Sequence, residues 1–197
     1  MATQQFITKQ DFDRYITQEN LNAITQNNDG VWILALSSVI ETVSSYLRFR
    51  YDTDNIFNIF IHVPADAYAT GISVIEGDLI YISIDAVPAG QPITNETYWK
   101  QSDTRNQAVT DIMVVLILYA LYSRINGSEI PNWVQVLYDG GDSQQRGGKL
   151  GFLKEIRKGT VEINLPLLPA VEDQTTQSGN SIAYGSAVGA VTRNTSI

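Results

Sequence analysis

The sequence predicts a mainly α-helical protein: a small helical bundle of three long helices and short N-terminal helices, with a β-rich insertion and an extended C-terminal arm. Three observations carry this prediction. Apolar residues recur at helical spacing along residues 28–52, and a dense apolar run lies within residues 105–125. Residues 55–102 instead combine β-branched and aromatic residues with glycines and prolines. Beyond Pro169 the chain is small, polar and glycine-rich.

Composition and charge narrow the classes of function. The chain has 197 residues, a net charge of −8, no cysteine and one histidine. Tight nucleic-acid binding needs clustered Lys and Arg side chains, and the sequence contains no such cluster. The lack of cysteine rules out disulfides and thiolate metal sites. Only 17% of residues are charged, while ten are Tyr and three are Trp. Because aromatic residues are enriched at interfaces, we expect part of the surface to be covered by partners.

These shifts in composition divide the chain into three parts. We expect residues 1–54 and 103–164 to form the helical core, residues 55–102 the β-rich insertion, and residues 165–197 an extended or flexible C-terminal arm. The N-terminus has neither a basic region nor an apolar run, so the sequence does not predict a secretory signal.

Two short helices are expected at the N-terminus. Thr8 can cap the first, and Asp11 lies at the spacing of a capping box. The second runs from about Glu19 to Ile24, with Leu21 and Ile24 facing inward.

The first long helix follows within residues 28–52, where Asn28 or Asp29 supplies the N-cap. One face is an apolar stripe that we expect to be buried: Trp32, Leu36, Val39, Ile40, Val43, Tyr46 and Leu47. The other face carries small hydroxyl side chains in place of charges: Ser37, Ser38, Thr42, Ser44 and Ser45. Such a face suits a second surface packing on it.

The second long helix runs from a cap at Asp103 or Thr104 to about Ile125. Its uninterrupted apolar part, residues 112–122, is about half of the roughly 20 residues that cross a bilayer. We therefore expect no membrane span. A helix that is apolar on nearly all faces is buried on nearly all faces. It is either the centre of the bundle or a bundle helix that also meets another subunit.

A third long helix is expected to begin at Pro131, because proline suits the first helical turn. The segment GGDSQQRGG, residues 140–148, then breaks or loosens it, since each glycine costs about 1 kcal/mol relative to alanine. Helical spacing resumes in KLGFLKEIRKG and stops at Gly159. For the C-terminal arm, residues 165–197, we expect either disorder or docking into a neighbouring subunit.

No catalytic, cofactor-binding or metal-binding residues are expected. His62 is the only histidine, so triads and histidine-based metal sites lack a partner. Carboxylates do occur in close pairs, which we interpret as turn and cap residues: Asp52 with Asp54, Glu76 with Asp78, and Asp139 with Asp142. A hydrolase that uses Asp or Glu alone remains the weakest alternative.

Several stretches together resemble the head-tail connector (adaptor, or head-completion) family of tailed bacteriophages. They are FITKQDFDRYI, SSVIETVSSYLRFRYD, DTRNQAVTDIMVVLILYALYSRIN and IPNWVQVLYDGG with LGFLKEIRKGTV. The most specific are VSSYLRFRYD (43–52) and LYALYSRINGSEIP (118–131). The resemblance covers about residues 5–164 and involves no catalytic residue.

The resemblance implies a non-enzymatic structural protein of the virion neck, assembled in the host cytoplasm, without cofactor and without membrane contact. About twelve copies would form a ring that binds the portal on one face and another neck or tail protein on the other. DNA would pass through the channel during ejection without sequence-specific binding. Residues expected in the core or in assembly contacts are Trp32, Leu36, Ile40, Leu47, Leu116, Leu118, Tyr122 and Trp133.

The insertion supports an alternative. GDLIYISIDAVPAGQPITNETYWKQSD (77–103) resembles a small β module of some carbohydrate-binding and phage tail proteins. Exposed aromatic faces stack on sugar rings, and the candidates are Tyr81, Tyr98 and Trp99. The same residues would otherwise form the hydrophobic core of the module or pack against a subunit. The alternative function is thus a carbohydrate-binding module attached to a virion structural protein.

Overall fold

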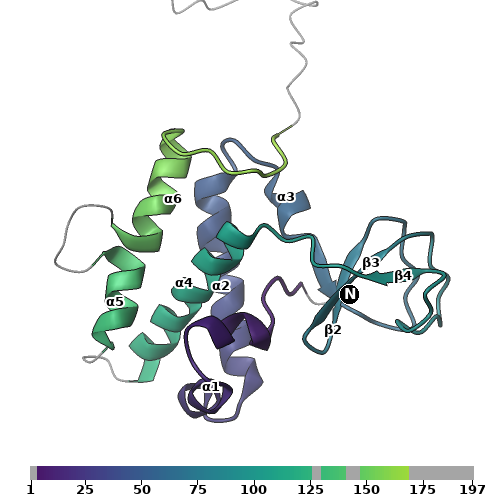
Figure 1. Ribbon diagram of the computed structural model, residues 1–197, viewed down its shortest axis with the longest axis horizontal. Coiled ribbons are helices and arrows are strands. Elements are labelled where there is room, and N and C mark those ends of the chain that lie inside the picture. Colours follow the sequence, from purple (N-terminus) through teal and green to yellow (C-terminus); the bar gives the residue numbers. More distant parts are fainter. Residues whose placement is uncertain (1–3, 126–129, 141–146, 169–197) are drawn as a thin grey trace, which may run out of the picture.

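The computed structural model describes residues 4–125, 130–140 and 147–168. Its elements, in chain order, are the 3₁₀ helix η1 (Lys9–Arg14), α1 (Gln18–Thr25), α2 (Asp29–Leu47), α3 (Thr53–Ile56), β1 (Ile59–Ile61), β2 (Ser73–Glu76), β3 (Leu79–Ser83), β4 (Trp99–Gln101), α4 (Gln107–Ile125), α5 (Asn132–Asp139) and α6 (Gly148–Lys158). Figure 1 shows a helical part built from α2, α4, α5 and α6, with α1 at one end and the sheet beside it.

The two N-terminal helices lie where the sequence predicts them. The first is a 3₁₀ helix, and the N–H of Thr8 donates to the Asp11 carboxylate at 2.7 Å, which is one half of a capping box. In α1 the buried positions are Leu21 and Thr25, whereas Ile24 is only partly buried.

Asparagine side chains start both long helices. In α2 the Asn28 Oδ1 accepts from the N–H of Gly30 at 3.0 Å, as the sequence predicts. In α4 the Asn106 Oδ1 accepts from the N–H of Ala108 at 3.0 Å. The prediction of a cap at Asp103 or Thr104 is therefore wrong. The carboxylate of Asp103 is engaged by the guanidinium of Arg105, and the helix begins only after that ion pair.

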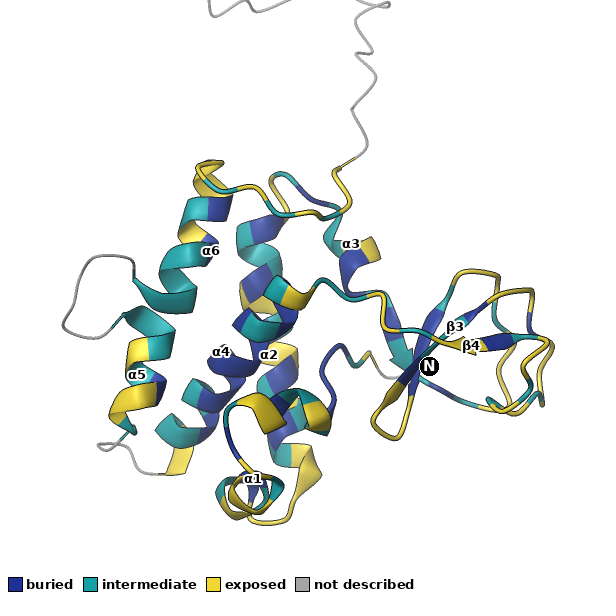
Figure 2. Cartoon of the chain, in the orientation of Figure 1, coloured by how far each residue is buried: buried dark blue, intermediate teal, exposed yellow. Residues whose placement is uncertain are grey.

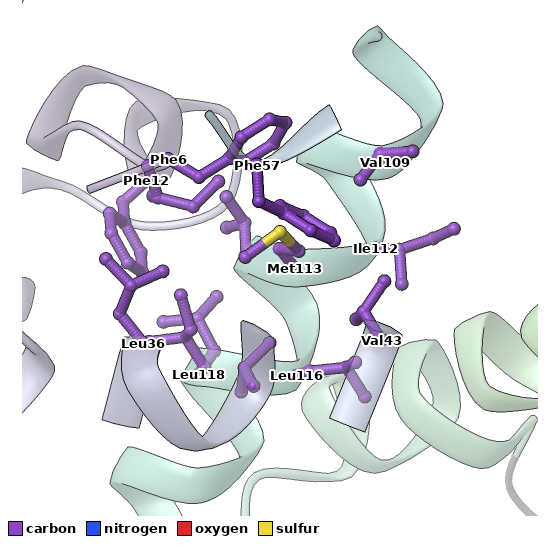
Figure 3. Packing of buried hydrophobic residues seen from close by; sticks show 14 of the residues in the cluster. Phe6, Phe12, Leu36, Val43, Phe57, Val109, Ile112, Met113, Leu116 and Leu118 are labelled. Carbon is purple, nitrogen blue, oxygen red and sulfur yellow. The ribbon is translucent and has the colours of Figure 1, made fainter. Parts of the chain in front are cut away.

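Helix α4 is the centre of the hydrophobic core. Every residue from Ile112 to Leu118 is buried, on all sides of the helix. Met113 lies among side chains from α2, the N-terminal segment and the segment after α3, as Figure 3 shows for Phe6, Phe57 and Val43. By length and composition α2 and α4 could each cross a membrane, a test that a core helix also passes. In α4, 56% of the apolar window is buried within this fold, against 33% in α2.

The predicted bundle of three long helices is wrong. Among the described residues only α2 and α4 are long, with 19 residues each. The expected third helix is two shorter ones, because Gly140 ends α5 at φ +92° and Gly147 precedes α6 at φ +63°. Figure 1 shows α6 following α5 along the same edge of the helical part. The amide nitrogen of Gly148 would lie only 3.1 Å from a Cβ at Gly140, so the two helix ends abut closely.

The fold also differs from the predicted helical bundle in its β part. The β-rich insertion forms a four-stranded mixed sheet that is a substantial part of the fold. Its order is β1-β2-β3-β4, with β1 parallel to β2 and the other neighbours antiparallel. The tight turn between β2 and β3 contains Gly77 at φ +63°. Gln4 extends the sheet by an antiparallel bridge to Phe60.

The sheet shares its core with the helices. Ile59, Ile75 and Ile80 belong to the same hydrophobic cluster as α2 and α4. The opposite face forms a second, small cluster around Val74, Val87 and Trp99. Figure 2 accordingly shows a lobe in which every strand contains buried residues, most of them in β2, while the connecting loops are largely exposed. One face of the sheet therefore depends on the helical part for its burial.

The start of the C-terminal arm is held by the segment after α2. The N–H of Leu168 donates to the carbonyl of Arg50 at 3.1 Å, and the N–H of Asp52 donates to the carbonyl of Pro166 at 2.9 Å. Leu167 and Leu168 are nonetheless exposed. The rest of the predicted arm, residues 169–197, lies outside the described residues.

Candidate assembly surfaces

The outer face of α2 is the first candidate surface. Because Trp32, Leu36 and Val43 face the core, the residues half a turn away face outward. Leu34 is 74% exposed there, and Phe49, just beyond the helix, is 57% exposed. Surface A is defined as Leu34, Ser37, Ser38, Glu41, Thr42, Ser45 and Phe49. Its one charged side chain is Glu41. The remaining members are small hydroxyl side chains that lie between the apolar residues Leu34 and Phe49.

The end of surface A is fixed by α6. The guanidinium of Arg157 lies 4.8 Å from the ring centroid of Phe49 and 5.9 Å from that of Tyr46. Arg50 pairs with Glu162 at 2.9 Å, in the segment that follows α6. These contacts hold Phe49 at the surface while leaving more than half of it exposed.

The outer face of α5 is the second candidate surface. Val134 is buried, whereas Trp133 and Val136 are 39% and 42% exposed. Ile125, at the end of α4, is 40% exposed and lies one turn beyond Tyr122. Surface B is defined as Ile125, Trp133 and Val136. It is a small apolar patch with a projecting indole.

Aromatic contacts hold surface B on α4. The Tyr122 and Trp133 rings meet edge to face with centroids 6.3 Å apart. The Tyr119 and Tyr138 rings are stacked, with centroids 3.7 Å apart. Burial raises the pKa of the Tyr138 phenol above its usual value, with smaller contributions from Tyr119 and from nearby charge. Ring packing thus holds α5 against α4, while Val136 of the same helix remains exposed.

Surface A lies on α2 and the residues just after it, and surface B lies on α5 and the end of α4. Helix α4 packs against both α2 and α5, and α6 packs against α2 and the end of α5. Figure 1 shows α5 at one edge of the molecule, with α4 between it and α2.

A buried ion pair positions the N-terminal segment against α4. All five N–H donors of the Arg105 guanidinium are used: two bonds reach Asp11, two reach Asp103, and one reaches the carbonyl of Phe6 at 2.7 Å. Burial disfavours charge on both Arg105 and Asp103. The hydrogen bonds between them outweigh it, raising the pKa of Arg105 and lowering that of Asp103.

The aromatic residues of the insertion face inward. The Trp99 side chain is 2% exposed and meets the rings of His62 and Tyr68 edge to face, at centroid separations of 5.4 and 5.3 Å. Tyr81 and Tyr98 are partly buried against the same cluster. The rings therefore form a small hydrophobic core, and Trp99 offers no open face to a sugar. His62 is buried, with its Nδ1 3.1 Å from Glu76.

The structure divides the expected core and assembly residues into two groups. Most lie in the interior: Trp32, Leu36, Leu47, Leu116 and Leu118 are buried, and Ile40 and Tyr122 are partly buried. Only Trp133 reaches the surface. The exposed members Leu34, Phe49, Ile125 and Val136 were not predicted. Leu34 has a signal in the sequence, because it precedes Ser38 by one turn on the hydroxyl face.

The described residues contain no group of three or more His, Cys, Asp or Glu side chains placed to hold a metal ion. Of the candidate carboxylates, Asp52 caps α3 by accepting from the N–H of Asn55, and Asp78 accepts from the N–H of Lys9. Glu76 contacts His62. Asp142 lies outside the described residues.

Comparison with models of known protein families, with curated proteins and with solved structures finds no match to this chain.

Proposed function

We propose that the protein is a structural virion protein of a tailed bacteriophage, forming a ring between the portal and the tail around the DNA channel. The observation that carries the proposal is surface A. An exposed helix face in a monomer normally bears charged and polar groups over its whole length. Surface A has one charge of its own, Glu41, and exposes Leu34 and Phe49 at its ends, with the guanidinium groups of Arg48 and Arg157 beside Phe49. Such a face is suited to permanent contact with protein.

The packing of the stretches that resemble the connector family also supports the proposal. VSSYLRFRYD (43–52) forms the end of α2 and the turn after it, and LGFLKEIRKGTV (150–161) forms most of α6 and the turn after it. Although about a hundred residues separate them, Arg157 lies over Phe49, and Arg50 lies beside Gly159. The stretches thus belong to one structural unit.

The proposed action needs no chemistry on a substrate. Subunits would meet through helix faces and hold the portal and the tail by many contacts at once. The net charge of −8 disfavours adhesion of DNA, because like charges repel and few Lys or Arg are present to bind phosphate. DNA would then slide through the ring.

Negative-stain imaging of the full-length protein, alone and mixed with tail-less phage heads that retain the portal, tests the proposal. We expect rings with a central channel, or density added at the portal vertex. A protein that stays monomeric at all concentrations and leaves the portal vertex bare contradicts it. The Leu34→Asp variant is the matched control, because it alters surface A at a side chain that the core does not use.

A further inference from the structure

A hollow with aromatic walls lies where η1, α1, α4 and α5 meet. Its volume is about 370 Å³, and the side chains that form its walls come from four parts of the chain: Tyr15 just after η1, Asn20 in α1, Tyr122 in α4 and Trp133 in α5. Small-molecule sites are concave, have volumes of this order, and combine aromatic side chains with a few polar groups. The hollow has the size and the composition of such a site.

The aromatic walls form a corner. The rings of Tyr122 and Trp133 are inclined at 83° to each other, with centroids 6.3 Å apart. In this edge-to-face arrangement one ring contributes only its edge, so both of its faces stay clear of the other ring. Trp133 is 39% exposed, and Tyr15 and Tyr122 are partly buried. Rings held in place in this way offer a flat apolar surface at little cost in conformational entropy.

The hollow also carries hydrogen-bonding groups that the fold does not use. Four side chains that line it make no hydrogen bond to another described residue: the phenols of Tyr15 and Tyr122, the Trp133 indole and the Asn20 amide. Burial raises the pKa of both phenols, and the charge of Asp111 adds to this at Tyr15. Both phenols therefore stay protonated at neutral pH and can donate as well as accept.

The charges at the hollow do not favour an ionic ligand. One acidic and one basic side chain line it, Asp13 and Arg14. Arg14 is already paired with Asp111 at 2.9 Å, and Asp13 accepts a hydrogen bond from Gln18. The lining therefore has no excess of positive or negative charge that would select an anion or a cation. A neutral ligand that has an apolar face and several hydroxyl groups fits it best.

A sugar ring has these properties, because one face consists largely of C–H groups that pack on aromatic rings, while its hydroxyls need hydrogen-bond partners. We infer that the hollow binds a neutral sugar, with its apolar face on the Trp133 ring and its hydroxyls bonded to Tyr15, Tyr122 and Asn20. This inference goes beyond the proposed ring, because one copy of the chain contains the whole site. It also places sugar recognition away from the insertion, where Trp99 is buried.

Tryptophan fluorescence reports on this hollow directly. Trp32 and Trp99 are 3% and 2% exposed, so quenching by acrylamide comes mainly from Trp133. The full-length protein is titrated with cellobiose, maltose, lactose and chitobiose, each in the presence of acrylamide. We expect saturable protection of Trp133 from quenching by at least one of these neutral disaccharides.

Two variants test the polar part of the site. Asn20→Ala and Tyr122→Phe each remove one hydrogen-bonding group while keeping the aromatic walls, and each should weaken sugar binding about two- to tenfold. Tyr46→Phe is the matched control, because it removes a phenol from α2, outside the hollow, and should bind sugar as the wild type does. Circular dichroism checks that all three variants are folded.

The inference is overturned if none of the disaccharides protects Trp133, or if protection is unchanged in both Asn20→Ala and Tyr122→Phe. Protection that appears without sugar when the protein concentration is raised would show that a second copy covers the hollow, and would overturn it as well. The images that test the proposed ring are recorded without sugar, so the ring and the sugar site can fail separately.

Discussion

Arg105 and Asp11 form a bidentate ion pair, with nitrogen–oxygen distances of 2.6 and 2.9 Å, across 94 positions of the chain. The Arg105 side chain is 5% exposed and the Asp11 side chain 13%. The pair joins the segment before α4 to η1, so it holds the N-terminal segment over the core helix.

Removal of Arg105 tests the importance of this pair. Arg105→Ala leaves the Asp11 carboxylate poorly solvated and unpaired, which should lower the free energy of unfolding by about 3–5 kcal/mol. Urea titration followed by circular dichroism measures the change. Arg14→Ala is the control, because Arg14 is 55% exposed in its pair with Asp111 and should cost about 1 kcal/mol or less. Equal losses in the two variants would contradict the buried role of Arg105.

Stability should depend on the ionisation of Asp103. Burial alone would raise its pKa, but hydrogen bonds from Arg105 lower the pKa of this carboxyl below its usual range. A lowered folded-state pKa means that the ionised form stabilises the fold above the unfolded-state value of about 3.9, and that this contribution is lost as the pH falls through the folded-state value. We expect Asp103→Asn to be less stable than wild type at pH 7. The gap should shrink below about pH 4, and a constant gap down to pH 3 would refute the assignment.

Two leucines separate folding from assembly. Leu118 is fully buried, and Leu118→Asp places an unpaired charge in the core, which costs several kcal/mol and should give insoluble or unfolded protein. Leu116→Asp should behave in the same way. Leu34→Asp lies on surface A and should fold with unchanged circular dichroism while losing the oligomer, as judged by light scattering. Soluble, assembled Leu118→Asp protein would contradict the central position of α4.

The aromatic cluster of the insertion should matter for stability and not for sugar binding. Trp99→Ala removes a buried indole and should cost about 3–5 kcal/mol, whereas Ile84→Ala, at a side chain 48% exposed in the same lobe, should cost less than about 0.5 kcal/mol. Thermal unfolding measures both. The isolated insertion would expose Ile59, Ile75 and Ile80, so a glycan array should use the whole chain. Glycan binding that Trp99→Ala abolishes while the fold survives would favour the alternative function.

Two C-terminal deletions should differ in their effects. Removal of residues 170–197 leaves the hydrogen bond from Leu168 to Arg50 in place and should not change the melting temperature. Removal of residues 165–197 also takes away the bonds at Pro166 and Leu168, and should lower it. We further expect the shorter deletion to abolish attachment to portal-containing heads. Unchanged attachment in a co-sedimentation assay would show that residues 170–197 have no part in it.

The sequence alone determined the two N-terminal helices, the start of α2 and the central helix α4. An apolar run without a polar face permits only burial on all sides, so the central place of α4 follows from residues 112–118. Asn28 and the apolar stripe of α2 likewise act within a few residues, and their positions are visible in the sequence. The glycine-rich segment 140–148 indicated an interruption of the third helix, but not that the two halves would be separate helices.

Only the tertiary structure decided which distant segments meet. Arg105 bonds to Asp11 and Phe6, which are more than ninety residues away in the chain. The parallel pairing of β1 with β2 involves no tight turn that the sequence would reveal. The burial of one face of the sheet depends on the helices, since Ile59, Ile75 and Ile80 share their cluster. Which apolar side chains of surfaces A and B remain exposed is also decided by the tertiary structure. The physical reason is one of range: caps and periodicity act between neighbours along the chain, whereas ion pairs, sheet order and exposed faces depend on packing across the whole fold.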